Sequence, residues 1–194
     1  MLSSSERKNI ISLIQLEVIP AIGCTEPIAV ALAVAKVKEL LNAIPDKIDV
    51  LLSANVLKNA MGVGIPGTGM VGLPIAIALG ALVGKSEYGL EVLKNVTPKA
   101  VDLGKTLIDK KIIGIHLKKD ILEKLYIEVE ATFAENKARV IISKEHNRFS
   151  FIELNNNILI DLIDDEIEKV KIDSLALSFD IVYEFALETP IEEI

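Results

Sequence analysis

One cysteine, Cys24, is the residue of this sequence whose type and position best suit it for catalysis. It lies between Gly23 and the run Thr25-Glu26-Pro27, where we expect a helix to begin because proline fits the first helical turn. The unpaired N–H groups of a helix N-terminus lower the pKa of a thiol, which favours a thiolate base or nucleophile. An ionised Glu26 nearby would oppose this effect, and a free cysteine is often simply a small buried apolar side chain. The sequence leaves these alternatives open.

The second candidate feature is the glycine-rich run 55–69, NVLKNAMGVGIPGTG. Glycines let a ligand approach the backbone, and free N–H groups there can bind a carboxylate or phosphate. If the run begins as a helix, Asn55, Lys58 and Asn59 share one face, and their amides and ammonium could hold a zwitterionic substrate. A turn that allows two buried helices to pack closely would have the same composition.

Three other patterns fail on inspection. The glycines of 62–67 match the spacing of a dinucleotide-binding loop, but a proline lies inside the pattern and no second strand ending in an acid follows. The run 80–86 is one residue short of a P-loop and lies at the end of a helix. His116 or His146 could serve Cys24 in a thiol hydrolase, but neither cysteine-protease signature is present.

Composition narrows the class of protein further. The chain has 194 residues and a formal charge of −7, which disfavours nucleic-acid binding. A single cysteine cannot form an intrachain disulfide, and it cannot hold zinc or an iron–sulfur cluster, which need three or four ligands. The apolar segments 28–35 and 73–83 are shorter than the ~20 residues of a membrane-spanning helix. With no export signal at the N-terminus, we expect a cytoplasmic protein.

The elements that position these residues can be read from the apolar spacing. We expect a helix over 5–18 with Ser5 as its N-cap, a buried helix from the Cys24 corner to about Leu41, and a strand over 47–53. Two further helices follow, one over the apolar segment 73–83 and one from Thr97-Pro98 to about Asp109.

The second part of the chain is richer in strands. Residues 125–133 alternate between apolar and polar side chains, which is typical of a sheet with one face in water. Turn sequences at 135–137, 145–147 and 155–157 predict an antiparallel meander, and a helix is expected from about Ser174 to Glu188. The chain is therefore predicted to be one α+β domain over 1–194, with a possible strand-rich subdomain over 112–165.

Two motifs carry a resemblance to a known family. The run from Val18 to Ala29, VIPAIGCTEPIA, closely resembles the signature of the L-cysteine desulfidase family, which is related to the α-chain of bacterial iron–sulfur L-serine dehydratases. The run from Lys58 to Thr68, KNAMGVGIPGT, resembles the second hallmark of that family. The resemblance covers essentially the whole chain, but family members are about twice as long and are similar to it over their first half.

This resemblance implies an iron–sulfur-dependent lyase that converts L-cysteine to pyruvate, ammonia and sulfide without pyridoxal phosphate. In the family a [4Fe-4S] cluster is held by three cysteines of the second half, so its ligands would lie outside this chain. Cys24 matches the proposed proton acceptor of the family. The residues expected to bind or orient the substrate are Glu26, Lys58, Asn59, Gly67 and Thr68.

The partners implied are an amino-acid substrate and either the C-terminal half or a separate subunit that supplies it, with a homo-oligomer as a further expectation. The same elimination with hydroxide as the leaving group would make L-serine the substrate. A ligand-binding module without the cluster half, or a structural interaction protein, are the non-catalytic alternatives.

Overall fold

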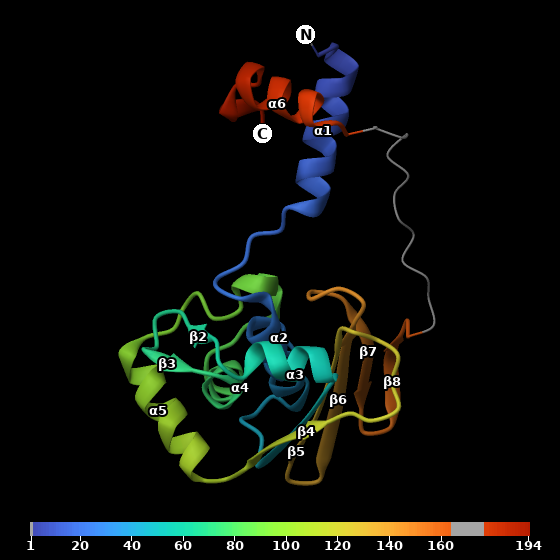
Figure 1. The fold of residues 1–194 in the computed structure, drawn as a ribbon. Coiled ribbons are helices and arrows are strands. Elements are labelled where there is room, and N and C mark those ends of the chain that lie inside the picture. Colours follow the sequence, from blue (N-terminus) through green and yellow to red (C-terminus); the bar gives the residue numbers. More distant parts are fainter. Residues whose placement is uncertain (1, 164–176) are drawn as a thin grey trace. The chain divides into compact units, whose positions relative to one another are not determined.

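The computed structural model describes residues 2–163 and 177–194 (Figure 1). The described residues form two compact units, one of residues 2–20 and 177–194 and the other of residues 21–163. Each unit has its own helices, and the larger one also contains the sheets. The candidate residues all lie in the larger unit.

The smaller unit consists of helices. Helix α1, Ser4–Glu17, begins after Ser3 and not after Ser5, because the Ser3 hydroxyl accepts from the backbone N–H of Glu6 while the Glu6 carboxylate accepts from Ser3. Helix α6, Phe179–Glu188, is followed by a short 3-10 helix, Ile191–Glu193. The first residues of the helix expected from Ser174, and the acidic turn at 164–166, lie outside the described residues.

The larger unit is built on a six-stranded sheet whose strand order is β4-β1-β5-β6-β7-β8. Strands β1 and β4 are parallel, and the other neighbours are antiparallel. The predicted meander is therefore confirmed from β5 to β8. The strands are β1 (Lys47–Leu52), β4 (Ile113–Leu117), β5 (Tyr126–Phe133), β6 (Asn136–Ser143), β7 (Phe149–Leu154) and β8 (Asn157–Asp161).

The predicted α+β class is confirmed. Because β1 comes from the helical first part of the chain and pairs with both β4 and β5, the later strands do not make their sheet alone. A strand-rich subdomain over 112–165 would therefore share its sheet with the helical part.

The helices of the larger unit lie in successive layers over one face of this sheet (Figure 1). Helix α2, Thr25–Leu41, packs on β5 and β6, α4, Leu73–Leu82, packs on α2, and α5, Pro98–Asp109, packs on α4. Since α2 and α4 have neighbours on more than one side, their sequences are apolar on nearly every face, as predicted. No helix among the described residues has the length and apolar character needed to cross a membrane.

Helices α2 and α4 touch backbone to backbone and run in the same direction. A Cβ at Gly80 would lie 2.6 Å from the carbonyl oxygen of Ala31, and one at Gly84 would lie 2.9 Å from the Cβ of Ala35. Gly80 and Gly84, four residues apart, thus lie against Ala31 and Ala35, which are also four residues apart and follow in the same order. The N-termini of both helices therefore lie at the same end of the unit.

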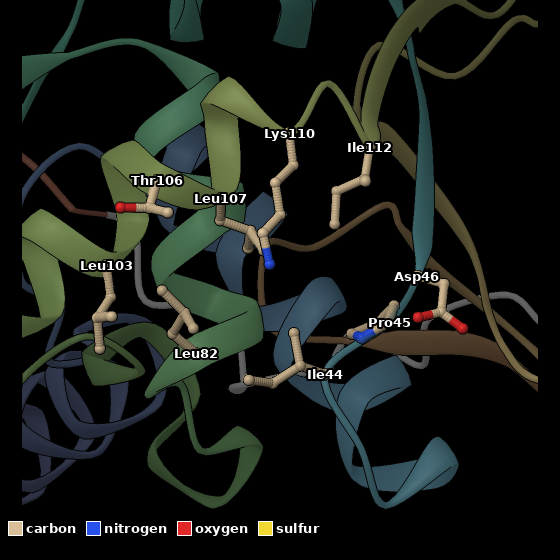
Figure 2. A pocket seen from close by; sticks show the side chains of 9 residues that line it. All are labelled: Ile44, Pro45, Asp46, Leu82, Leu103, Thr106, Leu107, Lys110 and Ile112. Atoms are coloured by element: carbon tan, nitrogen blue, oxygen red, sulfur yellow. The ribbon is translucent and has the colours of Figure 1, made fainter.

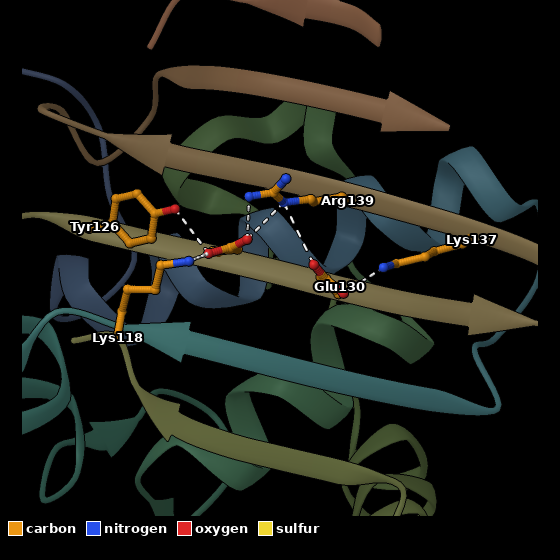
Figure 3. Close-up of polar contacts among 6 residues, drawn as sticks. Lys118, Tyr126, Glu130, Lys137 and Arg139 are labelled. Carbon is orange, nitrogen blue, oxygen red and sulfur yellow. Dashed lines mark hydrogen bonds and ion pairs between the residues drawn. The ribbon is translucent and has the colours of Figure 1, made fainter. Parts of the chain in front are cut away.

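The opposite face of the sheet carries a charged network centred on Glu128 (Figure 3). The predicted alternation of β5 is confirmed, because most of its apolar residues are buried and its polar residues lie on this face, but Glu128 itself is shielded from water. The Glu128 side chain is only 2% exposed. Its carboxylate accepts from Lys118 at 2.6 Å, from Arg139 at 2.6 Å and from Tyr126 at 2.9 Å. The long side chains of Lys118 and Arg139 lie over the carboxylate and exclude water from it while supplying the opposite charge.

Candidate functional site

The corner that precedes α2 has the form predicted from its sequence. Gly23 has φ +89°, a conformation that side-chain-bearing residues rarely adopt, and Cys24 is the N-cap residue of α2. Cys24 therefore lies immediately before the first turn of the helix. The thiol does not cap the helix. Instead Sγ of Cys24 donates a hydrogen bond to Oε2 of Glu26, 3.0 Å away.

The carboxylate of Glu26 is the centre of a small polar cluster. Besides the thiol, the Thr25 hydroxyl approaches Oε2 at 3.4 Å and the side-chain amide of Asn59 donates to Oε1 at 3.0 Å. Asn59 belongs to α3, Ala54–Ala60, so the glycine-rich run does begin as a helix, the condition under which Asn55, Lys58 and Asn59 share one face. The cluster is only partly buried, and solvent reaches both Cys24 and Glu26.

These hydrogen bonds decide which protonation state the cysteine adopts. The hydrogen bond to Glu26 raises the pKa of the Cys24 thiol, and partial burial raises it further. The same hydrogen bond lowers the pKa of the Glu26 carboxyl, as does the amide of Asn59. The carboxylate therefore outweighs the helix N-terminus, and the resting pair at neutral pH is a thiol beside an ionised carboxylate.

The glycine-rich run lies directly against the cysteine corner. A Cβ at Gly23 would come within 2.7 Å of the Cγ of Pro66, so the absence of a side chain at residue 23 permits this contact. The run continues beyond α3 as a short hairpin of β2, Gly64–Ile65, and β3, Met70–Val71. The hairpin leads into Gly72, the N-cap residue of α4. Both sequence motifs thus meet at the end of the unit where α2 and α4 begin.

The other predicted substrate-binding residues occupy different positions in this arrangement. Lys58 is exposed on α3, and Gly67, with φ +74°, is exposed in the hairpin turn. The Thr68 hydroxyl is engaged within the hairpin, donating to the carbonyl of Ile65 at 2.7 Å and accepting from the N–H of Met70 at 2.9 Å. Thr68 therefore holds the shape of the turn through its side chain.

One histidine, His146, lies near enough to this cluster to act on the Glu26 carboxylate. His146 lies in the turn between β6 and β7, and its charge contributes to lowering the pKa of Glu26. His116, by contrast, lies on edge strand β4 with its Nε2 3.3 Å from Asp49. Strand β6, which precedes this turn, packs against α2, the helix that carries Glu26. Nothing in the local sequence around His146 indicates this proximity.

The described residues contain no group of three or more histidine, cysteine or acidic side chains that could hold a metal ion.

A separate open cavity of about 410 Å³ lies at the opposite end of α2, between the α2–β1 connection and α5 (Figure 2). The Lys110 side chain reaches into it among apolar side chains such as Leu107 and Ile44. None of the predicted site residues lines this cavity.

Comparison with known proteins places this chain beside longer bacterial sequences. It is 60% identical over 193 residues to a protein of Bacteroides fragilis, covering all of this chain and 45% of that relative. A protein of Bacteroides thetaiotaomicron is 59% identical over 190 residues, and one of Aeromonas salmonicida is 42% identical over 187 residues. All three are named UPF0597 proteins.

The chain spans less than half the length of these relatives, 44% and 42% of the second and third. No family model matches the chain. No solved structure matches it either.

Proposed function

We propose that this chain is the N-terminal part of a lyase that eliminates sulfide from L-cysteine, with Cys24 as the base that removes the α-proton. The observation that carries this proposal is the meeting of Cys24, Glu26 and Asn59 in one partly exposed cluster. These residues come from the two motifs that resemble the L-cysteine desulfidase family, and they are adjacent in space although 33 residues separate Glu26 from Asn59.

The chemistry available to the cluster fits an elimination. A thiolate at Cys24 would take the Cα proton, the Cβ–S bond would break, and hydrosulfide would leave with the electron pair. The aminoacrylate product then tautomerises and hydrolyses to pyruvate and ammonia. Glu26 and Asn59 offer a carboxylate and an amide for the polar groups of an amino acid, and the glycine-rich turn offers backbone N–H groups for its carboxylate.

The residues of this chain do not fit an iron–sulfur cluster. Such a cluster is usually held by cysteine thiolates, and Cys24 is the one cysteine of the sequence. The cluster that the resemblance implies would have to be ligated by residues supplied by the C-terminal half or by a separate subunit. The relatives are more than twice as long as this chain, which is consistent with such additional residues.

The proposed function also implies a cellular compartment. We propose a cytoplasmic enzyme of amino-acid catabolism, because a reducing compartment keeps a lone thiol free of disulfides. A homo-oligomer is compatible with this proposal.

The test is an anaerobic assay of the complete protein with L-cysteine. We expect sulfide and pyruvate in equal amounts, and a loss of about 100-fold or more in turnover on Cys24→Ser, since general base catalysis contributes about that much. His116→Gln changes a histidine outside the cluster and should retain activity. Absence of sulfide from the wild-type protein would refute the lyase. Equal or faster turnover of L-serine would change the assigned substrate.

A further inference from the structure

The ionised carboxylate of Glu26 has only uncharged hydrogen-bond donors. The thiol of Cys24, the hydroxyl of Thr25 and the amide of Asn59 surround its two oxygens. Among the described residues, no lysine, arginine or histidine forms an ion pair with the Glu26 carboxylate. His146 lowers the pKa of Glu26 by a longer-range electrostatic interaction. Glu128, the other carboxylate in a dense network here, has two cationic partners. Glu26 therefore keeps an unneutralised charge at a site that solvent reaches.

We propose that the Glu26 carboxylate receives the ammonium group of a free α-amino acid, and that this ammonium displaces the Cys24 thiol from Oε2. The inference rests on the proposed function and deepens it, because it names the substrate group that Glu26 recognises and the event that releases the base. It restricts the substrate to amino acids with an unblocked amino group.

The geometry supports an exchange at one oxygen while the other is held. Asn59 donates to Oε1, whereas Cys24 and Thr25 both use Oε2. An ammonium forms a stronger, charge-assisted hydrogen bond with a carboxylate than a thiol does. The incoming cation can therefore take Oε2 while Asn59 keeps the carboxylate oriented toward the start of α2.

The displaced thiol then ionises more easily. Its hydrogen bond to Glu26, the main reason for its raised pKa, is lost, and the negative charge of Glu26 is neutralised. The S–H bond breaks and the proton leaves to solvent, which reaches the half-buried sulfur. The backbone N–H groups of Thr25 and Glu26 at the start of α2 remain to stabilise the thiolate. The base is thus produced mainly when an amino acid is in place.

The test uses the 194-residue chain, in which Cys24 is the one cysteine, and follows thiolate formation by its ultraviolet absorbance against a Cys24→Ser blank. The probe is L-alanine, which lacks a leaving group, and its matched control is N-acetyl-L-alanine, which lacks the ammonium. We expect L-alanine to lower the midpoint of ionisation by about one pH unit, a tenfold gain in thiolate, and N-acetyl-L-alanine to leave it unchanged.

Two variants distinguish the specific effect of Glu26 on the thiol from the effect of removing any one negative charge. Glu26→Gln should lower the midpoint by about one pH unit without ligand and abolish the response to L-alanine. Glu87→Gln removes an exposed carboxylate that pairs with Lys85, and it should behave as wild type. Equal effects of both ligands, no effect of L-alanine, or an unchanged midpoint in Glu26→Gln would each overturn the inference.

The two proposals fail separately. A complete protein that releases sulfide from L-cysteine while the chain ignores L-alanine would lose only the exchange at Glu26. A chain that responds to L-alanine while the complete protein releases no sulfide would retain amino-acid recognition and lose the lyase.

Discussion

Gly23 lies so close to Pro66 that a Cβ at residue 23 would meet the proline Cγ at 2.7 Å and Cδ at 2.9 Å. Gly23→Ala would add this clash to the strain of a non-glycine residue at φ +89°. We expect the free energy of unfolding to fall by about 2–3 kcal/mol, measured by urea denaturation.

Gly67→Ala is the matched control for this substitution. Gly67 also has a positive φ, +74°, but a Cβ there would meet nothing within 4 Å. We expect only the backbone strain, about 1 kcal/mol. If both variants lost the same stability, the contact between the cysteine corner and the glycine-rich turn would have no energetic weight.

The packing of α2 on α4 gives a second prediction about glycine. A Cβ at Gly80 would lie 2.6 Å from the Ala31 carbonyl oxygen and 3.1 Å from its Cα, and backbone atoms cannot rotate away. Gly80→Ala should destabilise the protein by about 2 kcal/mol despite the better helix propensity of alanine, as thermal unfolding would show.

Gly104→Ala provides the comparison in α5. The atom nearest to a Cβ at Gly104 is Cδ1 of Ile75 at 2.9 Å, the end of a side chain that can change rotamer. This variant should stay within about 1 kcal/mol of wild type. A Gly80→Ala protein as stable as Gly104→Ala would contradict the close approach of the two helices.

The network on the open face of the sheet predicts a large effect for one carboxylate and a small effect for its neighbour. Glu128→Gln would leave Lys118 and Arg139 without their shared anion. We expect a loss of about 2 kcal/mol, below the range for fully buried pairs because both cations reach water. Glu130→Gln removes a carboxylate that is 33% exposed, and it should cost less than about 1 kcal/mol. Chemical denaturation measures the stability lost in each variant. A larger loss in Glu130→Gln than in Glu128→Gln would contradict the prediction.

The same carboxylate predicts how stability depends on pH. Burial alone would raise the pKa of Glu128, but the hydrogen bonds from Lys118 and Tyr126 and the charge of Arg139 hold it below its ordinary value. The folded state therefore binds this proton less readily than the unfolded state does. The stability from Glu128 is present above about pH 4.3 and is lost as pH falls through the lowered pKa. The difference in unfolding free energy between wild type and Glu128→Gln should shrink in acid; a constant difference would contradict the network.

Local signals in the sequence located the boundaries of the longer helices and of strands β1 and β5. The glycine and proline around Cys24 predicted the start of α2, and Thr97-Pro98 predicted α5, which ends at Asp109 as expected. Helix α1 shows that the N-cap cannot be predicted from the type of one residue alone. Among three consecutive serines, the spacing of Ser3 to Glu6 selects the cap, because only that pair bonds in both directions.

The spacing of residue types in the sequence did not predict contacts between residues that are far apart along the chain. The alternation of β5 placed Glu128 on a polar face, but its burial depends on Lys118 and Arg139, which lie on other segments. The cluster of Cys24, Glu26 and Asn59 was likewise expected through family resemblance, and its spatial proximity depends on the contact of Pro66 with Gly23. The raised pKa of Cys24 follows from a side-chain rotamer, which the sequence does not specify.

The absence of side chains where α2 meets α4 bears on how this protein can move. Two helices in backbone contact at Gly80 and Ala31 have no side chains between them whose rotamers could absorb a sliding motion. The starting points of both helices should therefore keep a fixed separation. Any closure around the proposed amino-acid ligand would then come from α3 and the β2–β3 hairpin, moving relative to two helix ends held at a fixed separation.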